Sequence, residues 1–342
     1  MAQATNYLPS QDVSVWIQDE VVVGAEPDDA ALTRLQATSF TIPEASVPLE
    51  FSSARSGQYT TTATQAHHSE GTKLWTFDTT LRGTPFSVLK ACQAVFEQGS
   101  STAELDNDYA FIKDNYSVGV TTTAGSGAKT HDIRFINGGA DTTNHNIEVS
   151  GCVGTGFTLS QDIGSEGGEL VCTINWATGF MPVHSATDIS SPAYDEGTPK
   201  NIRNLSLTAA ELDTGNDMVI QSWELSVNRT IERVHYSDIT TGSFHPFGYV
   251  MTSPFEITGS LTVIRNDDVH DLLANFHNST GVALKLAEGT ATDFSVDVPK
   301  AMLGESTVDN GGAVLMQTIP FTGVADEDIG GSSEQVLGIQ IA

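Results

Sequence analysis

A thirteen-residue phrase that occurs twice restricts the fold of this chain more than any other feature. GGELVCTINWATG (167–179) and GGAVLMQTIPFTG (311–323) share their length, a Gly-Gly opening and a Thr-Gly close. Each ends a similar series of patterns: a strand, a long polar loop, a second strand, a helix and two closing strands. Chance similarity is the alternative, because alternation is common in β proteins, but the shared order favours a duplication.

The duplication predicts two tandem domains, residues 1–185 and 186–342, in a chain of 342 residues that is long for one domain. The stretch SATDISSPAYDEGTPK (185–200) is rich in Pro, Ser and Asp and is typical of a linker. The first copy is longer, so we expect an insertion around residues 100–144, where AGSGAK and INGGADTTN indicate extra hairpin turns.

The predicted fold class is mostly β: two tandem β-sandwich or β-barrel-like domains, each with one short α-helix and a long hairpin loop. In LWTFDTTL (74–81), Trp75, Phe77, Thr79 and Leu81 fall on one face of a strand and the intervening polar residues on the other. Similar alternation is present in VPLEF (47–51).

Only two segments have a helical period. TPFSVLKACQAVFEQ (84–98) begins with a Thr-Pro cap, and RNDDVHDLLANFHNST (265–280) has acids in its first turn. Their apolar residues recur at steps of three and four, which predicts two short amphipathic helices packed on sheet.

The charge of the chain excludes a protein that grips nucleic acid. Forty-three acidic and fifteen basic residues give a formal charge of −28, which repels phosphate and removes the counterion release that drives most DNA binding. One interpretation is a solvated acidic surface; the other is negative charge facing something that must pass without sticking.

The expected localisation of the chain and the redox state of its cysteines depend on sequence patterns that are missing. The start MAQATNYLPSQD has no signal-peptide character and the longest apolar runs are too short for a bilayer, so we expect a chain made in a cytoplasm, without a membrane partner. Cys92, Cys152 and Cys172 have no CxxC spacing, which predicts buried free thiols.

The chain resembles the major tail tube proteins of long-tailed, siphovirus-type bacteriophages, in their tandem-domain form. The resemblance rests on TFDTTLRGTPFSVLKACQAVF and GCVGTGFTLSQDIGSEGGELVCTINWATG in the first half. In the second half it rests on SWELSVNRTIERVHYSDITTG, FEITGSLTVIRNDDVHDLLANF and GGAVLMQTIPFTG. It covers most of the chain as a pattern, without a short diagnostic motif.

The resemblance implies a structural virion protein of the phage tail, assembled in the host cytoplasm. Its subunits would form rings, stacked into a tube around an acidic channel through which DNA leaves the capsid. A doubled subunit implies a homotrimeric ring with pseudo-sixfold symmetry, joined at its ends to other tail proteins, with DNA passing unbound and no cofactor.

Four acids on alternate strand positions are candidates to line the channel: Glu50, Asp78, Glu224 and Glu256. The alternative for each is an ordinary solvent-facing residue of an outer sheet.

Two long segments, 52–73 and 232–254, are candidates for contacts between stacked rings, because interfaces favour aromatic residues with polar partners. The candidate contact residues are Arg55, Tyr59, His67, His68, Tyr236, Phe244, His245, Phe247 and Tyr249. The alternative is a loop folded back on its own domain.

The sequence does not indicate an enzyme. It has no GxSxG, P-loop or helix-opening GxGxxG, and its carboxylates are evenly scattered. His67 and His68 would share a metal only in a loop conformation, so we expect no metal and no catalytic residue. The rival functions are a carbohydrate-binding or adhesion β-sandwich of a phage or bacterium, which would need exposed aromatic platforms, and a β-rich glycan hydrolase.

Overall fold

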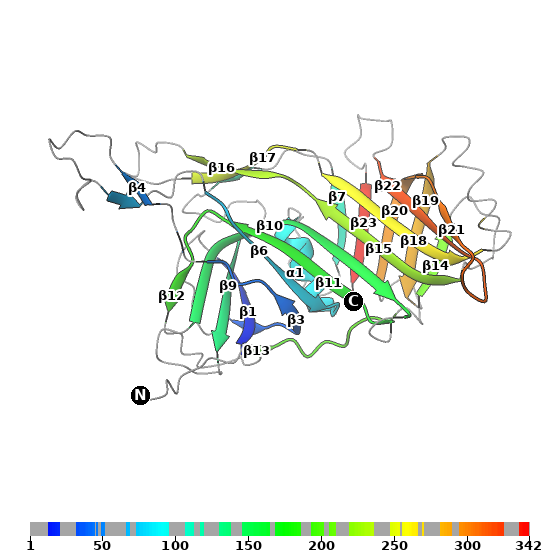
Figure 1. Ribbon diagram of the computed structural model, residues 1–342, viewed down its shortest axis with the longest axis horizontal. Coiled ribbons are helices and arrows are strands. Elements are labelled where there is room, and N and C mark those ends of the chain that lie inside the picture. Colours follow the sequence, from blue (N-terminus) through cyan, green and yellow to red (C-terminus); the bar gives the residue numbers. More distant parts are fainter. Residues whose placement is uncertain are drawn as a thin grey trace.

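The structure is a computed structural model of the chain (Figure 1). It describes residues 13–20, 32–44, 46, 49–51, 66–68, 73–95, 107–112, 117–119, 130–137, 146–164, 168–185, 193–201, 205–209, 219–235, 247–253, 255–265, 269, 281–288, 294–324 and 335–341. These residues are mostly β, so the predicted class is confirmed. The helix whose bounds they define is α1 (Pro85–Val95).

Six strands of the first half form one series of antiparallel neighbours. Across the sheet they are β3 (Ala37–Phe40), β6 (Trp75–Arg82), β11 (Val171–Thr178), β10 (Asn146–Asp162), β9 (His131–Asn137) and β1 (Val13–Asp19). The chain visits them in the order β1, β3, β6, β9, β10, β11, with α1 after β6.

Six strands of the second half form a series with the same topology. Across the sheet they are β15 (Ile220–Asn228), β18 (Glu256–Ile264), β22 (Met316–Gly323), β20 (Phe294–Leu303), β19 (Val282–Glu288) and β14 (Leu205–Ala209). The chain visits them in the corresponding order, with the helical residue Val269 after β18.

Irregularities of register recur at equivalent places in the two series. Thr38 is left out of the pairing between β3 and β6, and Gln221 is left out of the pairing between β15 and β18. The pairing of β9 with β10 shifts between Val149 and Cys152, and that of β19 with β20 shifts between their counterparts in β20. Because bulges are specific features of a strand pair, these matches set the two series in register with each other.

The repeated phrase does not match residue for residue. Written in line, the phrases set Ile174 beside Thr318, but the strand pairings place Ile174 at the position of Ile319, one residue further on. A shift of one residue exchanges the two faces of a strand. The repeated phrase therefore marks the equivalent strands β11 and β22. The residues that correspond in the structure are offset by one position from those that the two phrases set side by side.

The two series belong to one connected sheet because the later part of β10 pairs with β15 (Figure 1). One hydrophobic cluster also draws residues from both halves. The division at residue 185 falls at the end of β12 (Val183–Ser185), which pairs with the start of β10. Sheet and core continue across this point, and the division into residues 1–185 and 186–342 stays a prediction.

Shorter strands extend the sheet. β2 (Thr33–Arg34) pairs with β1 and with β13 (Ala193–Tyr194), and β21 (Thr307–Asp309) pairs with β22. β23 (Gln335–Ile341) pairs with β20 and with β7 (Asn107–Ile112). β7 and β8 (Ser117–Gly119) lie in the region where we expected an insertion, and neither has an equivalent among the second series.

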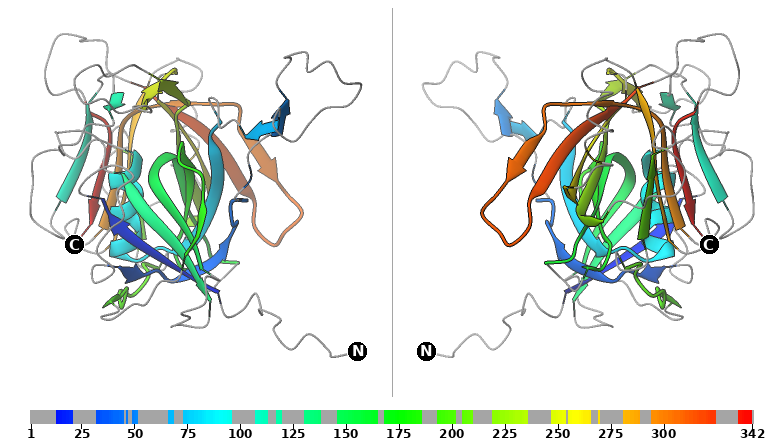
Figure 2. Two further views of the ribbon diagram at one scale, coloured as in Figure 1. Left: turned by 90° about the vertical axis from the view of Figure 1, so that its left-hand side faces the viewer. Right: turned by 90° about the vertical axis from the view of Figure 1, so that its right-hand side faces the viewer.

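Two strand pairs flank the predicted long loops. β4 (Leu49–Phe51) pairs with β5 (Ala66–His68), and Figure 2 shows this pair standing away from the main sheet. β16 (Ile231–His235) pairs with β17 (Phe247–Met251), which also pairs with β8. Residues 52–65 and 236–246, between the strands of each pair, lie outside the described residues.

Helix α1 begins as predicted but is buried on all sides from Ser87 onward, which corrects the expected amphipathic helix. Thr84 Oγ1 accepts a 3.1 Å hydrogen bond from the Ser87 N–H, as an N-cap does. Every residue from Ser87 to Val95 is buried, because α1 packs against β10, β11 and β23. The second predicted helix lies outside the described residues except for Val269, which is helical and buried.

Candidate functional site

The middle of the sheet has one apolar and one polar face. It consists of six neighbouring strands in the order β6, β11, β10, β15, β18 and β22. Trp75, Phe77, Thr79 and Leu81 of β6 are buried and the residues between them are not, so the alternation predicted for this strand is confirmed. Similar alternation in the later part of β10 and over most of β11, β15, β18 and β22 places their buried residues in the core.

Hydroxyl side chains dominate the polar face. One row in register, taken in strand order, contains Thr80, Thr173, Thr158, Ser226, Thr258 and Thr322. Thr80 and Thr173 are joined by a hydroxyl hydrogen bond of 3.2 Å, and Thr158 and Ser226 by one of 2.9 Å. These contacts pair hydroxyls across neighbouring strands and hold them against the sheet.

Three of the four predicted channel residues lie on this face: Asp78 on β6, Glu224 on β15 and Glu256 on β18. Glu224 and Glu256 are exposed, and Asp78 is half-buried and accepts a 2.6 Å hydrogen bond from Thr41 Oγ1. The sheet brings the three acids to one surface although they are far apart in sequence.

Glu50 is not on this surface. It lies on β4, opposite His67 of β5, in the separate two-stranded pair. The structure adds one acid that sequence reasoning missed, the exposed Asp162 at the end of β10, which is in register with Ser222 of β15. The sequence held a signal for it: Asp162 follows Thr158 and Ser160 at steps of two residues, which places the three on the same face of a strand.

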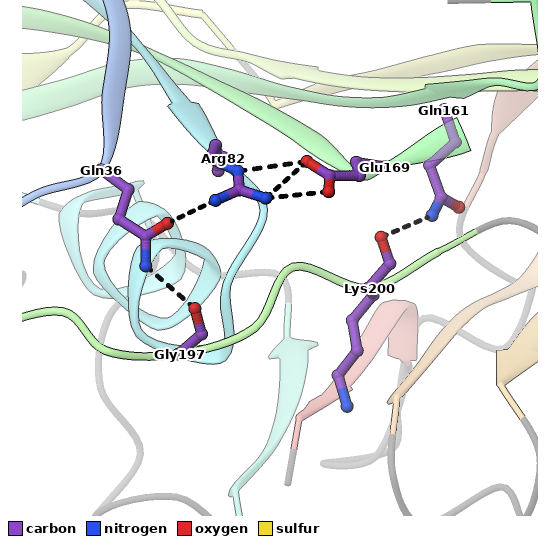
Figure 3. A network of polar contacts seen from close by, with 6 residues as sticks. All are labelled: Gln36, Arg82, Gln161, Glu169, Gly197 and Lys200. Atoms are coloured by element: carbon purple, nitrogen blue, oxygen red, sulfur yellow. Dashed lines mark hydrogen bonds and ion pairs between the residues drawn. The ribbon is translucent and has the colours of Figure 1, made fainter. Parts of the chain in front are cut away.

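Arg82 is the basic residue among the described residues of this face, and its charge is compensated (Figure 3). Its guanidinium forms a bidentate ion pair with Glu169, with Nη2 2.8 Å from Oε1 and Nε 3.1 Å from Oε2. Arg82 Nη1 also donates to Gln36 Oε1 at 3.1 Å, and Gln36 Nε2 donates to the Gly197 carbonyl at 2.9 Å. Because Glu169 neutralises Arg82, the polar face takes its negative charge from the carboxylates of Asp78, Asp162, Glu224 and Glu256.

The same network holds the 193–201 segment against the first half. The Lys200 carbonyl accepts a 3.3 Å hydrogen bond from Gln161 Nε2 of β10 (Figure 3). The Leu170 N–H donates to that carbonyl at 2.8 Å. The predicted linker is therefore packed where the structure describes it.

The predicted ring-contact residues are distributed over two strand pairs and the segments between them. His67 and His68 lie on β5, and Phe247 and Tyr249 lie on β17. Arg55, Tyr59, Tyr236, Phe244 and His245 lie outside the described residues.

Tyr249 differs from the expectation because it is buried within its own chain. Its hydroxyl donates to the Gly151 carbonyl at 2.9 Å and accepts from the Gly179 N–H at 2.7 Å. Burial raises the pKa of this hydroxyl far above its ordinary value. For Tyr249 the structure therefore favours the alternative of a segment folded back on the chain.

An ionic cluster beside α1, with Lys90 and His131 buried and Asp19 half-buried, was not found by sequence reasoning. Lys90 Nζ lies 2.6 Å from Asp19 Oδ1, and His131 Nδ1 lies 3.0 Å from the same oxygen. Burial raises the pKa of Asp19, but His131 and Lys90 outweigh it and hold that pKa well below its usual value. Asp19, Lys90 and His131 belong to β1, α1 and β9, outside the six strands of the polar face, and the contact of Lys90 with Asp19 joins α1 to β1.

The described residues contain no group of three or more His, Cys, Asp or Glu side chains placed to hold a metal ion. Cys92, Cys152 and Cys172 are free and buried, as predicted, and burial raises the pKa of Cys172 to about 12. No helix within the described ranges has the length and apolarity to cross a bilayer.

No protein-family model matches the chain, and no curated protein sequence matches it. The functional interpretation therefore depends on the sheet, its polar face and its edges.

Proposed function

We propose that this chain is the structural subunit of a hollow tube of the bacteriophage tail type, with the polar face of β6, β11, β10, β15, β18 and β22 toward the channel. The observation that carries the proposal is the composition of that face. It spans six strands, is rich in hydroxyls, contains four carboxylates and has its arginine neutralised by Glu169.

Such a wall suits the passage of DNA. Phosphates bind proteins mainly through Lys and Arg, with release of counterions, and carboxylates repel them. The repulsion acts over about 8–10 Å at physiological ionic strength, so it keeps the polymer off the wall without blocking a wider channel. The formal charge of −28 makes the whole subunit unfavourable for retention of DNA.

The repeated strand series supports a ring in which each chain supplies two similar sectors. Three chains would then form a homotrimeric ring with pseudo-sixfold symmetry, and stacked rings would form the tube. In this proposal the protein is part of the virion, assembles in the host cytoplasm, contacts other tail proteins at the tube ends and needs neither catalytic group nor cofactor.

The carbohydrate-binding alternative needs exposed aromatic platforms. Trp16, Trp75, Trp176 and Trp223 are all at most 4% exposed, so none of them offers such a platform. This observation leads us to prefer the tube.

Electron microscopy of the purified full chain over a range of concentrations tests the proposal. We expect hollow tubes with a regular ring repeat at high concentration, and rings or single subunits at low concentration. Particles that stay single and solid at all concentrations, together with binding on a glycan array, would favour the carbohydrate-binding alternative.

A further inference from the structure

The joint between the two halves gives a template for a contact between chains. In it, the later part of β10 pairs with β15, and Leu159 lies directly opposite Leu225. Both side chains are buried, with exposed fractions of 0% and 1%. This joint is an antiparallel strand pair with an apolar contact on its core side.

The strand β3 occupies in the first series the place that β15 occupies in the second. Ser39 and Ser222 are the first paired residues after the equivalent bulges, so Ile42 is the counterpart of Leu225. Among the described strands β3 pairs with β6 alone, so its other edge is unpaired by any of them. Ile42 is 39% exposed, whereas Leu225 is covered by β10.

In the second series, β20 and β21 together correspond to β10. β20 corresponds to its earlier part, and β21 corresponds to its later part. Leu159 of β10 pairs with Cys172 of β11, and Val308 of β21 pairs with Gln317, the equivalent residue of β22. Val308 is therefore the counterpart of Leu159. It is 46% exposed, and β22 is the one described strand that pairs with β21, so no described strand pairs with its other edge.

We propose that the free edge of β3 and its continuation to Pro43 pairs antiparallel with the free edge of β21 in a second copy of this chain, with Ile42 opposite Val308. The contact would repeat between chains the joint that β10 and β15 form within one chain. This inference rests on the proposed self-assembly and names its contact. Because the two edges differ, the contact is heterologous and continues into a ring or filament.

The backbone of β3 is compatible with this contact despite Pro43. The Thr41 N–H donates to the Asp78 carbonyl of β6 at 3.0 Å, so the N–H groups of alternate residues point toward β6. Residue 43 is one of those whose N–H would point toward β6. Pro43 lacks this N–H, but the free edge of β3 loses no donor. An unpaired strand edge with exposed apolar residues is an established template for pairing with another chain.

Disulfide trapping tests the proposed register. Ile42→Cys and Val308→Cys are made as separate full-length variants, mixed under mild oxidation and analysed by denaturing, non-reducing electrophoresis. We expect a covalent dimer in the mixture and little in either variant alone. The native cysteines are buried, which keeps the background low. The matched control mixes Ile42→Cys with Asp309→Cys, whose side chain points to the other face and should lose the cross-link.

A dimer that forms equally in the control mixture, or from Ile42→Cys alone, would overturn the register or the heterologous contact. Should a cysteine variant misfold, Ile42→Lys and Val308→Lys provide a second measurement by sedimentation at increasing concentration. Each should abolish association. Val219→Lys should leave it unchanged, because Val219 is exposed and its carbonyl accepts from the Ile264 N–H of β18 rather than lying on β3 or β21. Association that survives both edge variants would contradict the proposal.

The outcomes separate this inference from the proposed function. Tubes in the microscope without the expected cross-link would keep the tube and reject the β3–β21 contact. A specific cross-link in closed rings that never stack would keep the contact and reject the tube.

Discussion

The indole Nε1 of Trp223 donates a 2.6 Å hydrogen bond to Gln161 Oε1, and this bond joins the two halves of the chain. Trp223 lies on β15 and Gln161 lies directly opposite it on β10. Both side chains are buried, with exposed fractions of 2% and 1%. A buried polar pair at this position fixes the register of the strands that carry the polar face.

Trp223→Phe should lower the free energy of unfolding by about 1–3 kcal/mol, because it leaves the Gln161 carbonyl buried without that donor. Urea unfolding followed by circular dichroism measures the change. Trp75→Phe is the control, because it removes a 3.2 Å hydrogen bond to the carbonyl of exposed Ser46. Water can replace that bond. Apart from the effect of lost packing, Trp75→Phe should therefore lower the free energy of unfolding by less than Trp223→Phe does. Equal losses in the two variants would show that the Gln161 bond contributes little.

Gly259→Ala should destabilise the sheet by about 1–3 kcal/mol, since overpacking forces neighbouring atoms to move. A Cβ at position 259 would collide with Phe321 Cζ and would lie 2.5 Å from the Glu224 carbonyl oxygen. Gly312→Ala is the matched control, because its added Cβ would meet nothing nearer than 3.7 Å. Thermal unfolding of both variants checks this expectation, and an unchanged midpoint for Gly259→Ala would contradict it.

Asp19→Asn should lower the free energy of unfolding at pH 7 by about 2–4 kcal/mol, because Lys90 would lose the carboxylate that balances its buried charge. Chemical denaturation provides the measurement. Asp162→Asn, on the exposed polar face, should stay within about 0.5 kcal/mol of the wild type. A similar loss in both variants would assign the effect to net charge rather than to the buried cluster.

The contribution of Asp19 should also depend on pH. Its pKa in the folded chain is held below the ordinary value of 3.8, so the folded state binds this proton more weakly than the unfolded state does. The stabilisation is therefore complete above about pH 5 and is lost as pH falls below about 4 toward the depressed pKa. The stability difference between wild type and Asp19→Asn, measured from pH 7 to pH 3, should shrink on acidification; a constant difference would contradict the assignment.

Reversing charge on the polar face should make assembled tubes retain DNA. In the double variant Glu224→Lys with Glu256→Lys, two exposed carboxylates become cations, and binding should weaken steeply with added salt. Fluorescent double-stranded DNA incubated with purified tubes and then filtered measures the retention. Glu196→Lys changes an exposed acid outside this face, and retention as strong as in the double variant would argue against a channel-lining role.

The sequence allowed prediction of features that depend on near neighbours in the chain. The alternation of Trp75, Phe77, Thr79 and Leu81 has a period of two residues, and the start of α1 is set by the Thr84 cap. Three acids of the candidate face could be chosen because each alternates with apolar neighbours on its own strand. The order of patterns along the chain also indicated the repeated series.

Only the tertiary structure decided which strands are neighbours. The pairing of strands far apart in sequence then set the positions of the acids and the surroundings of α1. It placed Asp78, Glu224 and Glu256 on one face, put Glu50 in a separate strand pair, and buried every residue of α1 from Ser87 to Val95. Side chains far from one another in sequence share a surface or a core only once register is fixed, and a single sequence does not contain that register. The local patterns therefore determined the elements, whereas the pairing of β10 with β15 determined how the two halves meet and which edges remain free.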